Sequence, residues 1–281
     1  MRRPKVLYII IILICIIAVG VGVYTQFFTA KGQGKQGDTN NTQNNEEVVE
    51  EPNAFETMKE NFNLLFDNKF SAKENTELEV EKKKKAEEIV YTVFTKKEET
   101  DFYDIDINVP FINIKGDIPG EFNQITQTVF LSKANEILKN TDASKRSIYS
   151  IDYTANLSGE ILSVVIKASL KQGDNPQRII VQTYNYNIKT KEKVKIDDIL
   201  TIKSIGNEEI NNKITEMIQK AIKSAETLTA SGYSVYKRNI NDEMYIIDNI
   251  NTFFLGNNSK LYIIFAYGNK NFTSEMDVLE F

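Results

Sequence analysis

The chain has 281 residues, of which 41% are hydrophobic, 26% charged and 10% aromatic, a composition typical of a globular protein. It contains no histidine and a single cysteine. Ser-His-Asp and Cys-His catalysis, histidine-ligated metal sites and an intrachain disulfide are therefore excluded. The formal net charge is −5, whereas a nucleic-acid binder is expected to be basic, so we expect no nucleic-acid partner.

An apolar run without a charge occupies positions 6–23 and predicts a transmembrane helix over residues 6–24. Its length of about 27 Å, at 1.5 Å per residue, matches the hydrocarbon thickness of a bilayer. Arg2, Arg3 and Lys5 precede it, and the positive-inside rule places residues 1–5 in the cytoplasm as a short stub. We therefore expect a single-pass protein of the cell membrane with its C-terminal domain outside.

Three other readings of this run compete with the anchor. A buried core helix would contain polar interruptions, and a cleaved signal peptide would have a shorter apolar region followed by small residues rather than Tyr24, Gln26, Phe27 and Phe28. Lipid modification of Cys15 would fall in the middle of the run, after Ile14 instead of a small residue. An uncleaved anchor fits best, and beyond residue 5 the chain carries 31 Lys and Arg against 39 Asp and Glu, a net charge of −8.

Residues 25–52 are rich in Gly, Gln, Asn and Glu and predict a flexible tether. Residues 53–97 form a region that is either helical or a linker. Their first part has apolar residues at helical spacing, and the Lys82–Lys85 run could continue a solvated helix or lie in a loop. The helically spaced residues are Phe55, Met58, Phe62, Leu65 and Phe66.

The folded domain is expected over residues 88–281, and it begins with a hairpin. Strand-like alternation at 89–93 and 103–109 flanks a predicted turn at 96–99. An amphipathic helix follows over 122–138, and then a meander of strands at 149–157, 162–170 and 180–188. A second helix covers 210–225 with Asn207 as its N-cap, and short strands are predicted at 245–248 and 261–267. This order predicts an α+β fold, in which two helices pack on one face of a mostly antiparallel sheet.

The sequence predicts no catalytic residue, no metal site and no cofactor. Asp104 reads as part of the solvent-exposed face of a strand, the pair Asp197-Asp198 as a helix cap, and Asp242 as part of a loop. A hydrolase of the cell envelope that uses two of these carboxylates stays open as an alternative, because glycoside hydrolysis needs two acids in one cleft. A scaffold role in the membrane would depend on Gly20 and Gly22, which lack the usual spacing of helix-dimer motifs.

The predicted ligand-binding residues are Gly173, Asp174 and Asn175 in a turn, with Tyr184 and Tyr186 on the following strand. Alternating tyrosines commonly form the rim of a core. If exposed, Tyr184 and Tyr186 would form an aromatic platform for a protein or a sugar.

The segment from Tyr184 to Leu200, YNYNIKTKEKVKIDDIL, resembles part of the extracytoplasmic domain of RsiV-type proteins. In those proteins a strand ends in a Thr-Gly-Lys turn and continues into Leu-Asp-Asp. The resemblance covers residues 88–281 and implies an envelope protein of Gram-positive bacteria. Some members are membrane-bound anti-sigma factors whose outer domain binds lysozyme, and related domains precede peptidoglycan deacetylases or stand alone.

Two departures from that family limit what the resemblance implies. Residues 1–5 are shorter than a sigma-binding segment. The turn at 172–176, QGDNP, replaces a Gly-Gly-Ala-His-like turn, and Lys191 replaces the glycine of the Thr-Gly-Lys turn. The sequence therefore predicts a non-catalytic binding module on the cell surface. Its expected ligand is a cationic protein such as lysozyme, or peptidoglycan, and the net charge of −8 favours the cationic protein.

Overall fold

The computed structural model describes residues 54–72, 88–267 and 274–281, all within one unit of the chain, Glu50–Phe281. The predicted membrane helix, the tether and the Lys82–Lys85 run lie outside the described residues. Within the described ranges, no helix has both the length and the apolar character needed to cross a membrane.

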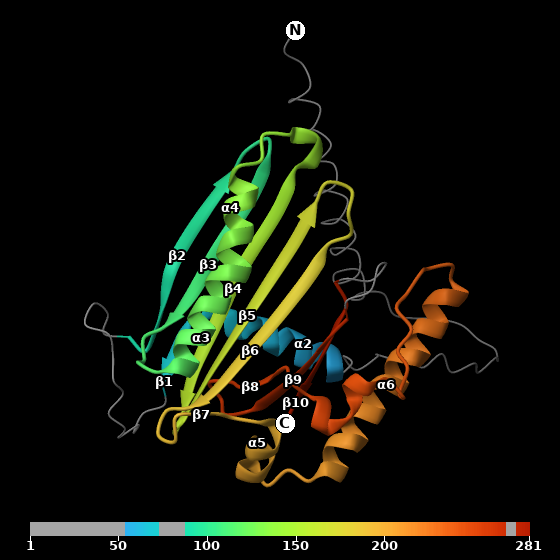
Figure 1. The fold of residues 1–281 in the computed structure, drawn as a ribbon. Helices are drawn as coiled ribbons and strands as arrows, with labels where there is room; N and C mark the ends of the chain where they lie inside the picture. The colour runs from blue at the N-terminus through green and yellow to red at the C-terminus, as the bar shows by residue number, and fades with distance from the viewer. Residues whose placement is uncertain (1–53, 73–87, 268–273) are drawn as a thin grey trace, which may run out of the picture. The chain divides into compact units, whose positions relative to one another are not determined.

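The larger of two sheets has seven strands in the described part of the chain, ordered β2-β3-β4-β5-β6-β7 with β1 beside β4 (Figure 1). The strands are β1 Phe70–Ala72, β2 Val90–Glu99, β3 Tyr103–Ile112, β4 Ser147–Ser158, β5 Ile161–Gln172, β6 Arg178–Asn187 and β7 Glu192–Lys193. Both β1 and β3 run parallel to β4, and the other neighbours are antiparallel. The predicted hairpin and meander are confirmed. The turn expected at 96–99 is wrong, because β2 continues to Glu99, which pairs with Asp104.

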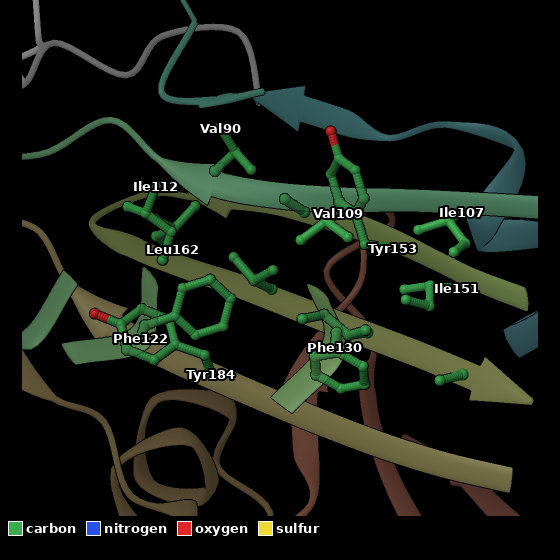
Figure 2. Packing of buried hydrophobic residues seen from close by; sticks show 14 of the residues in the cluster. Val90, Ile107, Val109, Ile112, Phe122, Phe130, Ile151, Tyr153, Leu162 and Tyr184 are labelled. Atoms are coloured by element: carbon green, nitrogen blue, oxygen red, sulfur yellow. The ribbon is translucent and has the colours of Figure 1, made fainter. Parts of the chain in front are cut away.

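One face of this sheet is covered by the first predicted helix, which is confirmed. It consists of α3 Asp117–Thr126, a π-helical segment Gln127–Leu131 and α4 Ser132–Leu138. Its apolar stripe packs on alternate residues of β3, β4, β5 and β6. Figure 2 shows Phe122 of this helix beside Tyr184 of β6, with ring centroids 4.8 Å apart.

The opposite side of the main sheet faces a second, antiparallel sheet. It consists of β8 Phe253–Leu255, β9 Leu261–Ala266 and β10 Met276–Glu280, in the order β10-β9-β8. β9 is buried on both faces: Tyr262 and Ile264 pack with Val165 of β5, while Leu261 and Ile263 point the other way. A strand covered on both sides reads as a continuous apolar run, which explains the sequence LYIIF.

The expectation that both helices pack on one face of one sheet is wrong. The second helix, α6 Asn207–Ala230, packs with α5 Ile196–Lys203 on the far face of the smaller sheet. The double burial of β9 requires this cover, since its second apolar face would otherwise contact water. The N-cap is Gly206 rather than Asn207.

Helix α2 Ala54–Leu64 confirms the helical spacing seen in the sequence, and it packs Phe62 between the two sheets. The strand expected at 245–248 is wrong. This segment forms two 3₁₀ turns, Glu243–Tyr245 and Ile247–Asn249, in which Tyr245 and Ile247 are buried and Ile246 is exposed. A short apolar run was therefore not enough to specify a strand. Strands β8 and β10 were not predicted.

Candidate binding site

The outer edge of β6 is open along half of its length. β7 pairs with its last two residues, and the Val194 amide donates to the outward carbonyl of Asn185. Outward groups alternate in an antiparallel strand, so Ile179, Val181 and Thr183 also direct their backbone N–H and C=O away from β5. Among the described residues no strand pairs with this part of β6. The open edge, from Ile179 to Thr183, is about 17 Å long.

A groove, which we name the α3 groove, surrounds the edge where α3 approaches β6. Its volume is about 360 Å³. Phe122 and Ile125 line it from the helix, and Asn251 and Phe253 line it from the other side of β6. The ion pair between Lys193 and Glu121, at 3.2 Å, also lies at this groove.

Part-exposed apolar side chains lie on the side of the sheet that faces α3. Ile125 and Val129, one turn apart on the helix, are 39% and 46% exposed. Ile180 of β6, on the same face as Tyr184, is 40% exposed. These residues leave apolar surface beside the open edge that a partner could cover.

A second groove, which we name the β9 groove, continues from the same edge on the side of the smaller sheet. Its volume is about 680 Å³, and Val181 of β6 forms one wall. Ile264 and Phe265 of β9 lie in its lining, together with two carboxylates, Glu243 and Asp248. No lysine or arginine of the described residues lines it, so the groove is acidic.

The two predicted tyrosines are buried rather than exposed, and the aromatic platform is not available. Tyr184 is 8% exposed and Tyr186 is 1% exposed, and their rings stack at 6.1 Å in the main core. Burial raises the pKa of Tyr184, and its hydroxyl has no hydrogen-bond partner in the described part of the protein. Tyr184 therefore forms a wall of the α3 groove without offering a free hydroxyl.

The predicted turn residues lie far from these tyrosines. Gly173 has a φ of +51°, and Asp174 and Asn175 are exposed beyond the ends of β5 and β6. Along β6, Arg178 and Tyr184 are separated by about 20 Å. The structure does not bring the two halves of the predicted site together.

The carboxylates of the hydrolase alternative are also dispersed. Asp104 pairs with Ile148, which pairs with Lys171 at one end of the sheet. Asp197 lies in the first turn of α5, which follows β7 at the opposite end, roughly 30 Å away along the strands. At this separation Asp104 and Asp197 do not form a catalytic pair. Asp242 precedes the 3₁₀ turn Glu243–Tyr245.

Asp198, the neighbour of Asp197, has the capping role that the sequence predicted for this pair. Its carboxylate accepts the Lys195 amide at 2.8 Å and closes the first turn of α5. In the turn just before, Lys191 has a φ of +64°, a left-handed conformation that glycine adopts at little cost. Among the described residues, no three side chains of the metal-ligating types cluster.

No protein-family model and no curated protein sequence matches this chain. Several solved structures resemble it, including the following two. One is a member of the DUF3298 family from Bacteroides fragilis, with a TM-score of 0.38 and 14% sequence identity; the match covers 63% of this chain and 81% of that protein. A DUF3298 family protein from Pseudomonas aeruginosa has a TM-score of 0.36 and 14% identity, with coverage of 63% and 80%. The resemblance to RsiV-type proteins stays a prediction.

Sequence reasoning predicted the strand that carries this edge but missed Val181, Glu243 and Asp248. Only Glu243 and Asp248 had a signal in the sequence, because they lie in an acidic loop that follows a predicted helix. Such loops are common on protein surfaces, and nothing in the sequence relates this loop to β6.

Proposed function

We propose that this chain is a single-span protein of the cell surface, and that its outer domain is a non-catalytic module that binds a cationic protein. The partner adds an extended segment to the open edge of β6. The observation that carries the proposal is the position of the acidic β9 groove at an unpaired strand edge. Strand addition supplies affinity through main-chain hydrogen bonds, and side-chain pockets supply specificity.

Side chains of an added strand would point alternately to the two faces of the main sheet. On one face they enter the α3 groove, where Ile125 and Phe122 favour apolar groups. On the other face they enter the β9 groove, where Glu243 and Asp248 favour lysine or arginine. A basic, extended segment of a cationic protein such as lysozyme satisfies both grooves.

The first experiment measures binding of the full-length, detergent-solubilised protein to lysozyme by calorimetry at two salt concentrations. Val181→Pro removes one outward N–H from the edge, whereas Val181→Ala keeps it. We expect the proline variant to bind about ten-fold more weakly, and the alanine variant to bind within about three-fold of wild type. An unfolding curve for each variant establishes that it is folded.

The second comparison tests the charge of the β9 groove. The double variant Glu243→Gln, Asp248→Asn should bind lysozyme about five- to ten-fold more weakly at low salt, and the difference should shrink at high salt. The matched control, Asp101→Asn with Asp104→Asn, removes the same charge at the far end of the sheet and should have little effect. Failure of lysozyme to bind, or equal binding by all variants, contradicts the proposed edge. Binding to purified peptidoglycan alone would replace the protein ligand with the cell wall.

The location is tested separately by adding protease to intact cells. We expect the domain to be cleaved from the outside, because the apolar run at 6–23 and its preceding cations orient it outward. A domain that is cleaved only after lysis would contradict the predicted orientation.

A further inference from the structure

A third groove, which we name the α2 groove, lies beside α2 on the face of the main sheet opposite α3. Its volume is about 240 Å³. The lining includes Lys59 and Asn63 of α2, Asp152 of β4 and Lys167 of β5. It touches one end of the open edge, because Ile179 of β6 lines it, but it shares no lining residue with the α3 or β9 groove.

Lys167 is held in this groove by neutral groups. Its ammonium donates to the side-chain oxygen of Asn63 at 2.8 Å and lies 4.5 Å from the centre of the Phe66 ring. Burial lowers its pKa, and Asp152 only partly opposes this effect. A half-buried cation that has an amide and a ring as partners keeps donors for a further, negatively charged group.

The carboxylate across the strand pair does not neutralise Lys167. Asp152 pairs in register with Lys167, but its carboxylate accepts the Lys69 ammonium at 2.7 Å. No carboxylate in the described residues lies within 4 Å of the ammonium of Lys167 or Lys59. The groove therefore carries an excess of positive charge in a protein whose net charge is negative.

Hydroxyl groups complete the set of donors. Ser150, Ser169 and Ser274 lie in the lining, and Ser169 already accepts a hydrogen bond from Gln177, so its own proton stays available. Two ammonium groups and several hydroxyls suit a group that only accepts hydrogen bonds.

We propose that the α2 groove binds an oxyanion, a carboxylate or a phosphate group, through Lys167 and Lys59. The anion accepts hydrogen bonds from the N–H groups of Lys167 that do not contact Asn63 or the Phe66 ring, and it neutralises the excess positive charge. Lys69 holds Asp152 and so keeps this carboxylate from repelling the ligand.

The test titrates the full-length, detergent-solubilised protein with sodium phosphate and, separately, with sodium acetate, and follows the lysine side-chain resonances by NMR. Chloride keeps the ionic strength constant. We expect saturable shifts of Lys167 and Lys59. Saturation by phosphate alone identifies a phosphate site, by acetate alone a carboxylate site, and by both a general oxyanion site.

Variants separate a specific site from general charge effects. Lys167→Met keeps the stem on Phe66 but removes the ammonium, and it should weaken binding about ten-fold or more. Lys59→Met changes a helix-surface residue with no risk to the core and should also weaken binding. The control Lys171→Met, at an exposed position of the same strand, should bind as wild type. All three should bind lysozyme normally, since the open edge is unchanged. The absence of saturable shifts with either anion, or unchanged affinity in both Lys167→Met and Lys59→Met, overturns the proposal.

Discussion

The side-chain amide of Asn185 donates a 2.7 Å hydrogen bond to the backbone carbonyl of Phe253. Its oxygen accepts the hydroxyl of Ser163 at 2.7 Å, and that same hydroxyl accepts the Leu255 amide. Thr183 makes equivalent bonds one step along β6, where it accepts the Phe253 amide. Polar side chains of the main sheet thus take the place of a neighbouring strand for the free edge of β8. This arrangement prevents the edge from pairing with another chain.

Removing this amide should destabilise the protein. Asn185→Ala leaves the Phe253 carbonyl and the Ser163 hydroxyl buried with a lost partner, and we expect a loss of about 2–3 kcal/mol in the free energy of unfolding. Urea denaturation measures it. Asn175→Ala, the same change in an exposed turn, should cost less than about 0.5 kcal/mol. Equal effects of the two changes would mean that the bonds to β8 contribute nothing.

The ion pair between Arg238 and Asp277 fastens the segment after α6 to β10. Two hydrogen bonds, of 2.6 and 2.8 Å, join the guanidinium and the carboxylate, and both side chains are nearly buried at 11% and 12% exposure. Asp277→Asn preserves the shape but leaves the guanidinium with only the more distant carboxylate of Glu275, at 3.8 Å, so we expect a loss of about 3 kcal/mol in thermal or urea unfolding. The control is Glu136→Gln, which breaks an exposed pair with Lys133 and should cost less than about 0.5 kcal/mol. A small effect at Asp277 would show that water reaches the pair.

Stability should fall in acid through Glu280. Burial opposes its ionisation, but hydrogen bonds from Lys260 and Tyr262 outweigh burial and hold its pKa below the ordinary value. A carboxylate whose pKa is lower in the folded state stabilises the protein above its unfolded pKa of about 4.3, and this stabilisation is lost as the pH falls through the folded value.

We therefore expect Glu280→Gln to be less stable than wild type at pH 7, and the difference to shrink below about pH 4. Chemical denaturation across this range measures the difference. Glu226→Gln, at an exposed position on α6, should differ little from wild type at pH 7. A Glu280→Gln difference that is constant with pH would contradict the assignment.

Two glycine-to-alanine changes should have opposite signs. A Cβ at Gly256 would lie 2.8 Å from the ring of Tyr262, which stacks on Phe254 between the sheets. Gly256→Ala should therefore cost about 1–3 kcal/mol. Gly120, inside α3, has open space at its Cβ, so Gly120→Ala should stabilise the protein by about 0.5–1 kcal/mol. Melting temperatures that move in the same direction for both variants would refute this reading.

Strands were predictable from the sequence where one of their faces is exposed to solvent, because apolar and polar residues then alternate. Ile105 and Ile107 of β3 alternate with polar residues, and Tyr149 and Ile151 of β4 do the same, and all four are buried as the period of two requires. The segment at 245–248, with the sequence Tyr-Ile-Ile-Asp, does not alternate with polar residues, and it forms 3₁₀ turns instead of a strand. Tyr245 is buried there because its hydroxyl meets that of Tyr267, a contact that no local pattern reports.

The candidate site depended on features that the sequence does not express. Tyr184 and Tyr186 could line either a surface or a core, and the answer came from Phe122, which covers Tyr184 from a helix distant in sequence. The open edge of β6 exists because β7 ends after two residues. The length of a strand's edge neighbour cannot be inferred from the alternation of apolar and polar residues in the strand itself.

By itself the sequence determined the absence of histidine chemistry, the α+β order of elements and the face that each amphipathic element buries, because these follow from composition and local spacing. Only the tertiary structure decided which element covers each face. A stripe of apolar residues encodes the need for a partner, and the partner is chosen by the shape and free energy of the assembled core. For that reason α6 covers the smaller sheet, and Glu243 and Asp248 come to lie beside the unpaired edge of β6.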